Sequence, residues 1–462
     1  MRARAVLGWL DDRLGYSTAV KPLVEHPVPQ TGWDYTIGSA ALIAFTVQVV
    51  TGVALAFTYV PTPNDAYESL QFISNDAILG NLVRGIHFWG ASAMVLLVSA
   101  HAAQVFLIGS FKFPREVNWL SGTVLLVFTF GMAFTGQLLR WNQDAYWAIV
   151  VGASQAARAP VIGQFLVGVL FAGPEIGGAT LTRFYATHVF MVPAIIISLL
   201  GIHLYLVIRH GVSEPPVPGV LVDRRTYRER YAALVHKVGV PFWPDAGWKD
   251  VVFALAVGTV VLGLSIWLGP PALGAKADPT VLQAYPRPDW YFLWYFALLA
   301  LIPPVVENVF IIGFPLALGL MFVLLPFVAP QGERSPRRRP WAIGFVAVVG
   351  VSIAALVNIG QQAPWSPVLG DVTLPASVTQ GLDPTQQAGA QIFEQHGCIN
   401  CHTVAGAGGK RGPELSAIGG QLSADQMTWR ILSGGQNMPA YGDTMTPQEL
   451  SQLVAFLSTL KS

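Results

Sequence analysis

Seven apolar runs of about 20 residues dominate this chain and limit what it can fold into. A helix of that length matches the hydrocarbon thickness of a lipid bilayer. Backbone amides inside a bilayer must be hydrogen-bonded internally, so isolated apolar runs there form helices. The sequence therefore predicts an all-α bundle of seven membrane spans: 35–59, 80–109, 117–139, 184–208, 250–268, 309–329 and 341–359.

The composition also indicates a membrane protein. Only 11% of the 462 residues are charged and 53% are hydrophobic, whereas a soluble surface needs more charge. The 27 Lys and Arg nearly balance the 26 Asp and Glu, so no nucleic-acid partner is expected. A shorter apolar run, 291–304, has about 14 residues and fits an interfacial or re-entrant segment better than a span.

Loop charges predict how the chain is oriented in the cell inner (cytoplasmic) membrane. Basic residues concentrate in the N-terminal segment and in the second, fourth and sixth loops, which the positive-inside rule places in the cytoplasm. Residues 1–32 lack an unbroken apolar core and are predicted to be an amphipathic segment on that surface. An odd number of spans then places the C-terminal part on the outer, periplasmic or extracellular, face.

The C-terminal part of the chain differs from the rest in composition. Residues 361–382 are rich in Gln, Pro, Ser and Thr and are predicted to be a linker. Residues 383–462 are soluble in character, with a helix-like opening and a helix-like close. They are enough for one small α-helical domain, whose core would be marginal without a cofactor.

Cys398 and Cys401 are the only cysteines in the sequence, and His402 follows them directly. Cys-x-x-Cys-His is the attachment motif of c-type haem, in which the thiols bind the haem and the histidine ligates its iron. A structural disulfide or a thioredoxin-like redox pair is the alternative, but a redox pair normally sits in a βαβ context, which this sequence does not predict. Covalent haem attachment outside the cytoplasm agrees with the predicted orientation.

A methionine is the expected sixth ligand of that iron, because methionine raises the haem potential. Met438 is preferred, since Pro439 fixes the chain beside it and the stretch NMPAY resembles the methionine loop of small cytochromes c. Met427 and Met445 are the competing candidates.

Four of the nine histidines lie within predicted spans, where ionisable residues are functional by default. His87 and His101 are 14 residues apart in the second span, and His188 and His203 are 15 apart in the fourth. Such a separation rises about 21–22 Å along a helix and returns to roughly the same face. Both spans run in one direction, so His87 matches His188 in depth and His101 matches His203. The sequence predicts two stacked bis-imidazole sites, each suited to a noncovalent haem b.

Glycines recur at the same spacing in the first and third spans. Gly38 and Gly52 are 14 residues apart, as are Gly122 and Gly136. We expect the missing side chains to leave room for the two haems. Ordinary close packing of helices is the alternative explanation for each glycine.

Two arginines stand just outside one histidine pair. Arg84 precedes His87 and Arg183 precedes His188. Both are predicted to pair with propionates of the outer haem, because a guanidinium binds carboxylates in a bidentate manner. The alternative is that they only extend toward the membrane interface.

Residues 1–360 resemble cytochrome b of the quinol–cytochrome c and plastoquinol–plastocyanin reductases. The resemblance rests on FKFPREVNWLSG (111–122), GQLLRWNQDAYWA (136–148), GATLTRFYATHVF (178–190) and PDWYFLW (288–294). The spacing of the histidines and the seven spans match the chloroplast-type version, whose two parts are usually separate chains. Here a four-helix part (33–215) and a three-helix part (216–360) are predicted to be fused, followed by a small cytochrome c (383–462).

The resemblance implies roles for individual residues. His87 and His188 would ligate an outer, low-potential haem b, and His101 and His203 an inner, higher-potential one. The PDWY stretch, which contains Asp289 and Tyr291, would border a quinol-oxidation site. Asp289 stands where many members have a Glu that takes a quinol proton. From the residues alone, a helix cap explains Asp289 equally well.

Two positions depart from the family pattern. Chloroplast-type proteins hold an extra inner haem through one cysteine in the first span, and Thr36 stands about there, so that covalent haem is not expected. The family usually has proline where this chain has Arg140, close to the oxidation site.

The resemblance implies a subunit of a quinol–cytochrome c oxidoreductase. Quinol would be oxidised near Asp289, one electron passing to a Rieske iron–sulfur protein and then to haem c, the other crossing two b haems to quinone, with proton translocation (a Q-cycle). The Rieske protein would be a separate subunit, a soluble cytochrome or cupredoxin would accept electrons, and the complex would be a homodimer of several subunits.

One alternative is a dihaem anchor of a membrane dehydrogenase, which would lack PDWY. The other is a transporter, which would show broken helices and internal repeats.

Overall fold

The computed structural model describes residues 2–15, 18, 25–172, 176–278, 286–362, 372–409, 412–434, 438, 440–442 and 444–461. Within these residues, seven helices are long and apolar enough to cross a membrane, as the sequence predicts. They span Trp33–Ala56, Gly80–Leu107, Glu116–Leu138, Gly178–His210, Trp248–Trp267, Val305–Val328 and Pro340–Gln362. The short apolar run forms α13 (Trp290–Leu301), which is too short to be a span.

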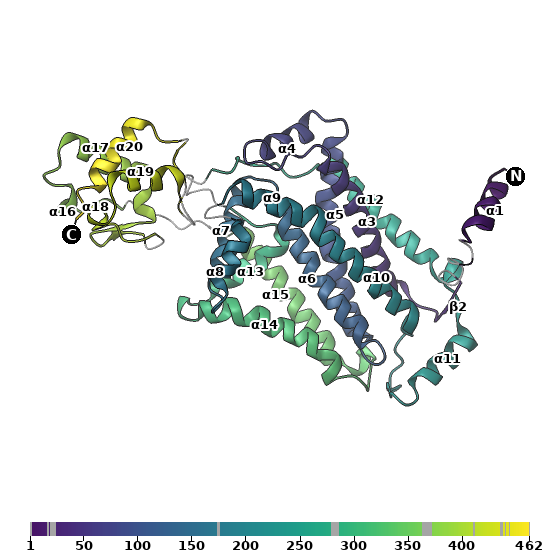
Figure 1. Cartoon of the computed structure of the whole chain (residues 1–462). Coiled ribbons are helices and arrows are strands. Elements are labelled where there is room, and N and C mark those ends of the chain that lie inside the picture. Colours follow the sequence, from purple (N-terminus) through teal and green to yellow (C-terminus); the bar gives the residue numbers. More distant parts are fainter. Residues whose placement is uncertain are drawn as a thin grey trace.

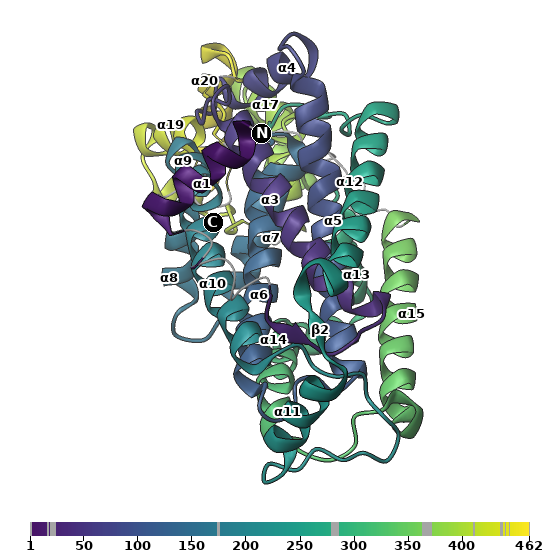
Figure 2. The ribbon, with the colours of Figure 1, turned by 90° about the vertical axis from the view of Figure 1, so that its right-hand side faces the viewer.

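The first four spans pack as two pairs of helices. α3 (Ile37–Ala56) lies along α5 (Gly80–Leu107), and α6 (Glu116–Leu138) lies along α10 (Val192–His210). Figure 2 shows α3 beside α5. The pairs matter for the site, because each joins one glycine-bearing span to one histidine-bearing span.

The fourth span is not a uniform α-helix. It consists of α9 (Gly178–Ala186), a π-helical turn η2 (Thr187–Met191) and α10. Pro193 follows the turn, and a proline has no N–H to donate and collides with the carbonyl four residues earlier. The wider turn accommodates the proline and contains His188. Turns of this kind are frequent at functional sites.

The remaining spans cover the first four. α12 (Trp248–Trp267) packs on α3 and α5, α14 (Pro304–Val328) packs on α6, and α13 packs on α15 (Pro340–Gln362). The connections α4 (Ala66–Asn75) and α7 (Gln143–Ala157) lie at one end of the bundle, and α11 (Tyr227–Val238) lies at the other (Figure 1). We call these the α7 end and the α11 end. Further short elements are α8 (Gly163–Phe171), η1 (Trp33–Thr36), η3 (Phe242–Ala246), η4 (Pro336–Arg338) and the antiparallel strands β1 (Pro27–Val28) and β2 (Val240–Pro241).

Hydrogen bonds join the four-helix and three-helix parts at both ends. At the α11 end, Lys112 Nζ donates to the carbonyls of Ala329 (2.8 Å) and Gln331 (2.7 Å). At the α7 end, the indole of Trp89 donates to the carbonyl of Gly269 (2.8 Å). The two parts therefore pack as one bundle.

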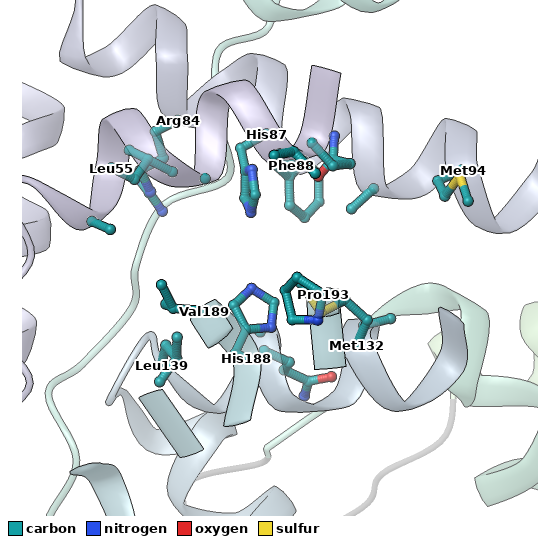
Figure 3. Close-up of a pocket in the computed structure, with 18 of the residues that line it drawn as sticks. Leu55, Arg84, His87, Phe88, Met94, Met132, Leu139, His188, Val189 and Pro193 are labelled. Carbon is teal, nitrogen blue, oxygen red and sulfur yellow. The ribbon is translucent and has the colours of Figure 1, made fainter. Parts of the chain in front are cut away.

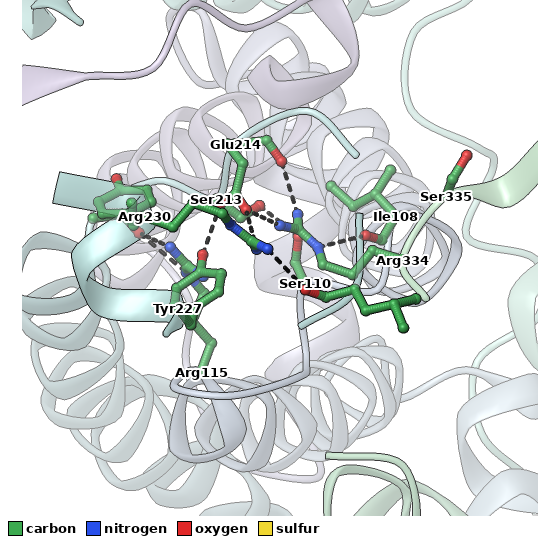
Figure 4. Close-up of polar contacts among 12 residues, drawn as sticks. Ile108, Ser110, Arg115, Ser213, Glu214, Tyr227, Arg230, Arg334 and Ser335 are labelled. Carbon is green, nitrogen blue, oxygen red and sulfur yellow. Dashed lines mark hydrogen bonds and ion pairs between the residues drawn. The ribbon is translucent and has the colours of Figure 1, made fainter. Parts of the chain in front are cut away.

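A buried polar network stabilises the α11 end (Figure 4). Arg334 Nη1 is 2.8 Å from Glu214 Oε1, and the Tyr227 hydroxyl donates to Glu214 Oε2 (2.7 Å). Arg115 Nη1 donates to the Tyr227 oxygen (2.6 Å). Burial alone would raise the pKa of Glu214, but the charge of Arg334 and the Tyr227 hydrogen bond outweigh it, and the pKa is lowered. Several basic residues that the sequence assigns to loops are thus buried.

The C-terminal part forms a separate small helical domain. Its elements are α16 (Ala376–Thr379), α17 (Pro384–Gln395), η5 (Cys398–Asn400), β3 (Thr403–Val404), β4 (Ala407–Gly408), α18 (Ile418–Gln421), α19 (Ala424–Ser433) and α20 (Pro447–Leu457). α17 packs on α20, and Phe393 and Phe456 meet edge to face in the core.

The segment that connects the C-terminal domain to the bundle is shorter than the predicted linker, 361–382. α15 continues to Gln362, and Leu374, Val378 and Leu382 pack into the core of the C-terminal domain. Residues 363–371, which belong to the predicted linker, are not among the residues that the structure describes. At the other terminus, α1 (Arg2–Leu14) is helical and exposes Val6 and Trp9, as an amphipathic segment would.

Candidate functional site

His87 and His188 face each other across a cavity at the α7 end (Figure 3). Their ring centroids are 6.4 Å apart and their planes are inclined by 82°. With a metal–nitrogen bond of about 2 Å on each side, two imidazoles that share one iron would have centroids about 6 Å apart. The spacing of this pair, called the His87–His188 site below, fits an iron held between the rings.

Each of the four sequence-predicted glycines lies against one of the four histidine rings. A Cβ built on Gly52 would be 3.3 Å from His87 Cε1, and one on Gly136 would be 2.6 Å from His188 Cε1. The same distance is 3.0 Å from Gly38 to His101 and 3.3 Å from Gly122 to His203. The glycines therefore make room for the imidazoles.

Hydroxyl groups orient three of the four imidazoles. The Nδ1 atoms lie 2.9 Å from Thr51 Oγ1 at His87, 3.1 Å from Thr135 Oγ1 at His188 and 2.9 Å from Ser121 Oγ at His203. Each hydroxyl belongs to the residue just before the glycine that touches the same ring. Thr51 donates its own proton to the Val47 carbonyl (2.7 Å), so it accepts from Nδ1 and leaves Nε2 free to bind a metal.

The second pair, called the His101–His203 site, is built differently. The two residues are close enough to interact electrostatically, which agrees with their predicted common depth. Ile37 precedes Gly38, so His101 has no hydroxyl at the position that provides one to each of the other three histidines. Among the described residues, buried His101 Nδ1 has no hydrogen-bond partner. The repeated Ser/Thr-Gly pattern was visible in the sequence, but its function is clear only from these contacts.

The two sequence-predicted arginines lie differently relative to the cavity. Arg84 lines it, and its guanidinium donates to Ser74 Oγ (2.8 Å) and the Pro271 carbonyl (2.8 Å). Arg183 is exposed and donates to the Val169 carbonyl (2.6 Å). Arg84 is therefore placed for the predicted propionate contact, and the contact of Arg183 stays a prediction.

Asp289 and Tyr291 line the same cavity as the His87–His188 site. Asp289 occupies the N-cap position just before α13, but its side chain makes no capping hydrogen bond. Its Oδ1 lies 2.8 Å from Arg140 Nη2, and its Oδ2 accepts from the Tyr291 hydroxyl (2.9 Å). The backbone N–H of Asp289 donates to Gln137 Oε1 (3.2 Å). The carboxylate is thus part of a site, and the interpretation of its side chain as a helix cap is wrong.

Burial dominates the chemistry of Tyr291. It raises the pKa of the phenol well above its ordinary value of 10.0, and the negative charge of Asp289 raises it further. Tyr291 therefore remains a hydrogen-bond donor at neutral pH. Sequence reasoning noted Arg140 as a departure from the family but did not predict its ion pair with Asp289.

The C-terminal domain forms a third site around His402. His402 Nδ1 lies 2.8 Å from the Pro413 carbonyl, which leaves Nε2 free for a metal, and Gly412 lies against the ring. Burial raises the pKa of the Cys398 thiol to about 12, whereas the reactive thiol of a redox pair has a lowered pKa. The site therefore fits covalent haem attachment better than thiol exchange.

The three candidate methionines differ in burial. Met427 and Met445 are 3% and 7% exposed and belong to the hydrophobic core. Met438 is only partly buried and packs at the edge of that core, as Cys398 does. Pro439 lies outside the described residues. This difference favours Met438 as the sixth ligand, which stays a prediction.

Each of the three parts of the chain matches a known protein family. Residues 24–211 match the family described as "Cytochrome b/b6/petB", and residues 276–374 match "Cytochrome b(C-terminal)/b6/petD". Residues 384–457 match "Cytochrome C oxidase, cbb3-type, subunit III". The three matches follow the order of the four-helix part, the three-helix part and the C-terminal domain.

Individual relatives agree with these matches. The chain is 42% identical over 212 residues to cytochrome b6 of Heliobacterium modesticaldum, covering 45% of this chain and 100% of that protein. It is 34% identical over 345 residues to the cytochrome bc complex cytochrome b subunit of Chlorobaculum thiosulfatiphilum, covering 72% of this chain and 76% of that one. A solved chain of a hyperthermophilic respiratory Complex III has a TM-score of 0.66 at 27% identity and covers 78% of this chain and 92% of that chain. The chain carries a cytochrome c domain at its C-terminal end. It belongs to the cytochrome b/b6 family and is a multi-pass membrane subunit of a cytochrome bc oxidoreductase complex.

Proposed function

We propose that this chain oxidises membrane quinol at its α7 end, beside Asp289. One observation carries the proposal: the Asp289 carboxylate lines the same cavity as His87 and His188. Quinol oxidation requires a group that accepts protons next to a group that accepts single electrons. The cavity provides a carboxylate for the first task and a bis-histidine site for the second.

The chain's own residues handle the proton. One O–H bond of quinol breaks and its proton binds an oxygen of the Asp289 carboxylate; the second O–H proton leaves to water on the outer face, and the two electrons leave separately. Tyr291 holds Oδ2 of that carboxylate and Arg140 holds Oδ1, so the base is oriented before quinol arrives. Oriented general bases accelerate proton transfer without having to be reorganised during the reaction.

The histidines prepare three places for one-electron carriers. The His87–His188 and His101–His203 sites would each hold a noncovalent haem b, and Cys398, Cys401 and His402 a covalent haem c. When bound, these groups supply one-electron transfer across and beside the membrane. The hydroxyls of Thr51, Thr135 and Ser121 bind Nδ1 of three of the imidazoles, which leaves Nε2 of each ring available for a metal.

We further propose that the two electrons of quinol take different routes. One goes to a Rieske iron–sulfur protein and then to the His402 site, and the other goes inward to reduce quinone near the His101–His203 site. Both cysteines of the sequence lie in the His402 motif, and the described residues contain no cluster of three or more metal-binding side chains. An iron–sulfur cluster must therefore come from a separate subunit.

The orientation and assembly follow the same proposal. The α7 end faces the periplasm or cell exterior, the N-terminus lies in the cytoplasm, and the C-terminal domain lies outside, where a soluble cytochrome or cupredoxin collects its electron. A homodimer of several subunits is expected from the resemblance of the chain to a Complex III subunit.

The test uses the purified complex and the Asp289→Asn variant. The amide cannot hold the proton, so quinol-dependent reduction should slow at least tenfold while all haem spectra stay intact. Asp65→Asn, at an exposed carboxylate hydrogen-bonded to Thr62, is the control and should leave the rate unchanged. Removal of the iron–sulfur subunit should stop haem c reduction by quinol. Full-rate reduction without that subunit would refute the divided route, and an unchanged rate in Asp289→Asn would refute the role of the carboxylate.

A further inference from the structure

The ion pair between Arg140 and Asp289 has an electrostatic consequence for the neighbouring His87–His188 site. The pair is 2.8 Å long, with side chains that are 18% and 15% exposed, so water screens it only in part. Arg140 follows α6 four residues after Gly136, which touches the His188 ring, and both ions of the pair line the cavity. A change in the net charge of this pair therefore acts on the site that would receive an electron.

The pair is neutral only while Asp289 is ionised. Its other neighbour, Tyr291, stays protonated and cannot supply a compensating negative charge, because burial raises the pKa of its phenol. Arg84 lines the same cavity and is close enough to Arg140 to repel it, so it adds a positive charge and no negative one. When Asp289 binds a proton, Arg140 is left as an uncompensated cation beside His87 and His188.

We infer that Arg140 is a positioning residue that couples proton uptake by Asp289 to electron uptake at the His87–His188 site. Before the reaction, Arg140 holds the carboxylate in place through a contact of 2.8 Å. After one O–H proton of quinol has moved to Asp289, the freed positive charge attracts the electron that remains to be transferred. The inference rests on the proposed function for the role of Asp289, but the charge effect itself needs no quinol.

An uncharged residue at position 140 could not provide such a charge. The coupling depends on two residues that are 149 positions apart in the sequence. A unit charge about 10 Å away, acting through an effective dielectric constant of about 20, changes a reduced-to-oxidised ratio roughly tenfold.

Equilibrium redox titration of the purified protein, without quinol, tests the coupling. Asp289→Asn mimics the protonated carboxylate and should raise the midpoint potential of the His87–His188 haem, with a roughly tenfold shift in its reduced-to-oxidised ratio at fixed ambient potential. Arg140→Gln leaves the carboxylate alone and should lower that potential. The double variant should return close to the wild type, and Arg140→Lys, which keeps the charge, should resemble the wild type.

Two controls separate this effect from a general disturbance. The haems at the His101–His203 and His402 sites should keep their potentials in every variant, because they are farther away. Arg158→Gln breaks a pair with Glu307 that does not line the cavity and should leave all three potentials unchanged.

The outcome distinguishes the inference from the proposed function. If Asp289→Asn and Arg140→Gln shift the potential in the same direction, or not at all, the coupling is refuted. The quinol-oxidation test of Asp289 would then still stand by itself. If Asp289→Asn oxidises quinol at the normal rate while the opposite potential shifts appear, the electrostatics hold and the proposed proton transfer fails.

Discussion

Gly136 lies so close to His188 that a Cβ at this position would stand 2.6 Å from Cε1 of the imidazole ring. Carbon atoms do not approach one another that closely, so either the ring or the helix would have to move. The backbone of α6 thereby determines where the His188 ring can sit. The same relation links Gly38, Gly52 and Gly122 to the other three rings, which explains their spacing of 14 residues.

Gly136→Ala should therefore displace the His188 ring and expel the haem b next to it. The wild type should contain two haem b for each haem c, and the variant about one, as measured by a pyridine haemochrome assay. Gly131→Ala is the matched control, because the same helix leaves open space around that position. Equal haem contents in the two variants would contradict the proposed role of the glycine.

The Thr51 hydroxyl should tune the potential at the His87–His188 site. It accepts the Nδ1–H of His87 and so makes Nε2 a more basic ligand, which favours oxidised iron. Thr51→Val should raise the midpoint potential of that haem in a redox titration. Thr46→Val, whose hydroxyl only bonds the Leu42 carbonyl, should not.

The His101–His203 site offers the reverse experiment. Ile37→Thr would place a hydroxyl before Gly38, as in the sequence before the other three glycines, and His101 Nδ1 has no hydrogen-bond partner among the residues that the structure describes. The variant should lower the potential of that haem and leave the His87–His188 haem unchanged. A shift of the same sign in both haems would instead indicate a general change in packing.

Met438 should control the potential of the haem in the C-terminal domain. Met438→His replaces a thioether ligand by a more basic nitrogen and should lower the potential, because methionine ligation raises it. Met427→Leu and Met445→Leu keep the volume of two core residues and should leave the potential unchanged. A large fall of potential in either control would assign the ligand to that methionine.

Glu214 should contribute to stability at the α11 end in a pH-dependent manner. Its folded-state pKa is lowered from the ordinary value of 4.5, so its contribution is complete above that pH and is lost as the pH falls through the lower, folded-state value. Glu214→Gln leaves buried Arg334 without its carboxylate partner and should destabilise the protein by about 3 kcal/mol at neutral pH. Thermal unfolding of the detergent-solubilised protein should show this difference shrinking as the pH falls.

An exposed pair provides the comparison for Glu214. Lys276 and Glu68 are 2.6 Å apart, but their side chains are 42% and 50% exposed. Glu68→Gln should therefore cost less than about 1 kcal/mol, because water and salt screen such pairs. A similar loss of stability in both variants would show that burial of the Glu214 network is not the reason for its effect.

Local features of the sequence were enough to predict the helical membrane architecture, which the structure confirms, and they nominate haem ligands that stay a prediction. The length of an apolar run determines whether a helix can cross a bilayer, and all seven predicted spans are present. Spacings of 14 and 15 residues place two histidines on one face of a helix at different depths, whatever surrounds that helix. The Cys-x-x-Cys-His motif is likewise complete within five consecutive residues, 398–402.

Only the tertiary structure decided which side chains from different helices meet. In the folded bundle, Arg140 pairs with Asp289, and one glycine lies against each of the four histidine rings. Among the described residues, His101 Nδ1 has no hydrogen-bond partner. Arginines that the sequence assigns to loops take part in a buried polar network. Helical periodicity gives the face on which a side chain lies, but a contact of 2.8 Å depends on how two helices are rotated, shifted and spaced. Those quantities result from the packing of the whole bundle.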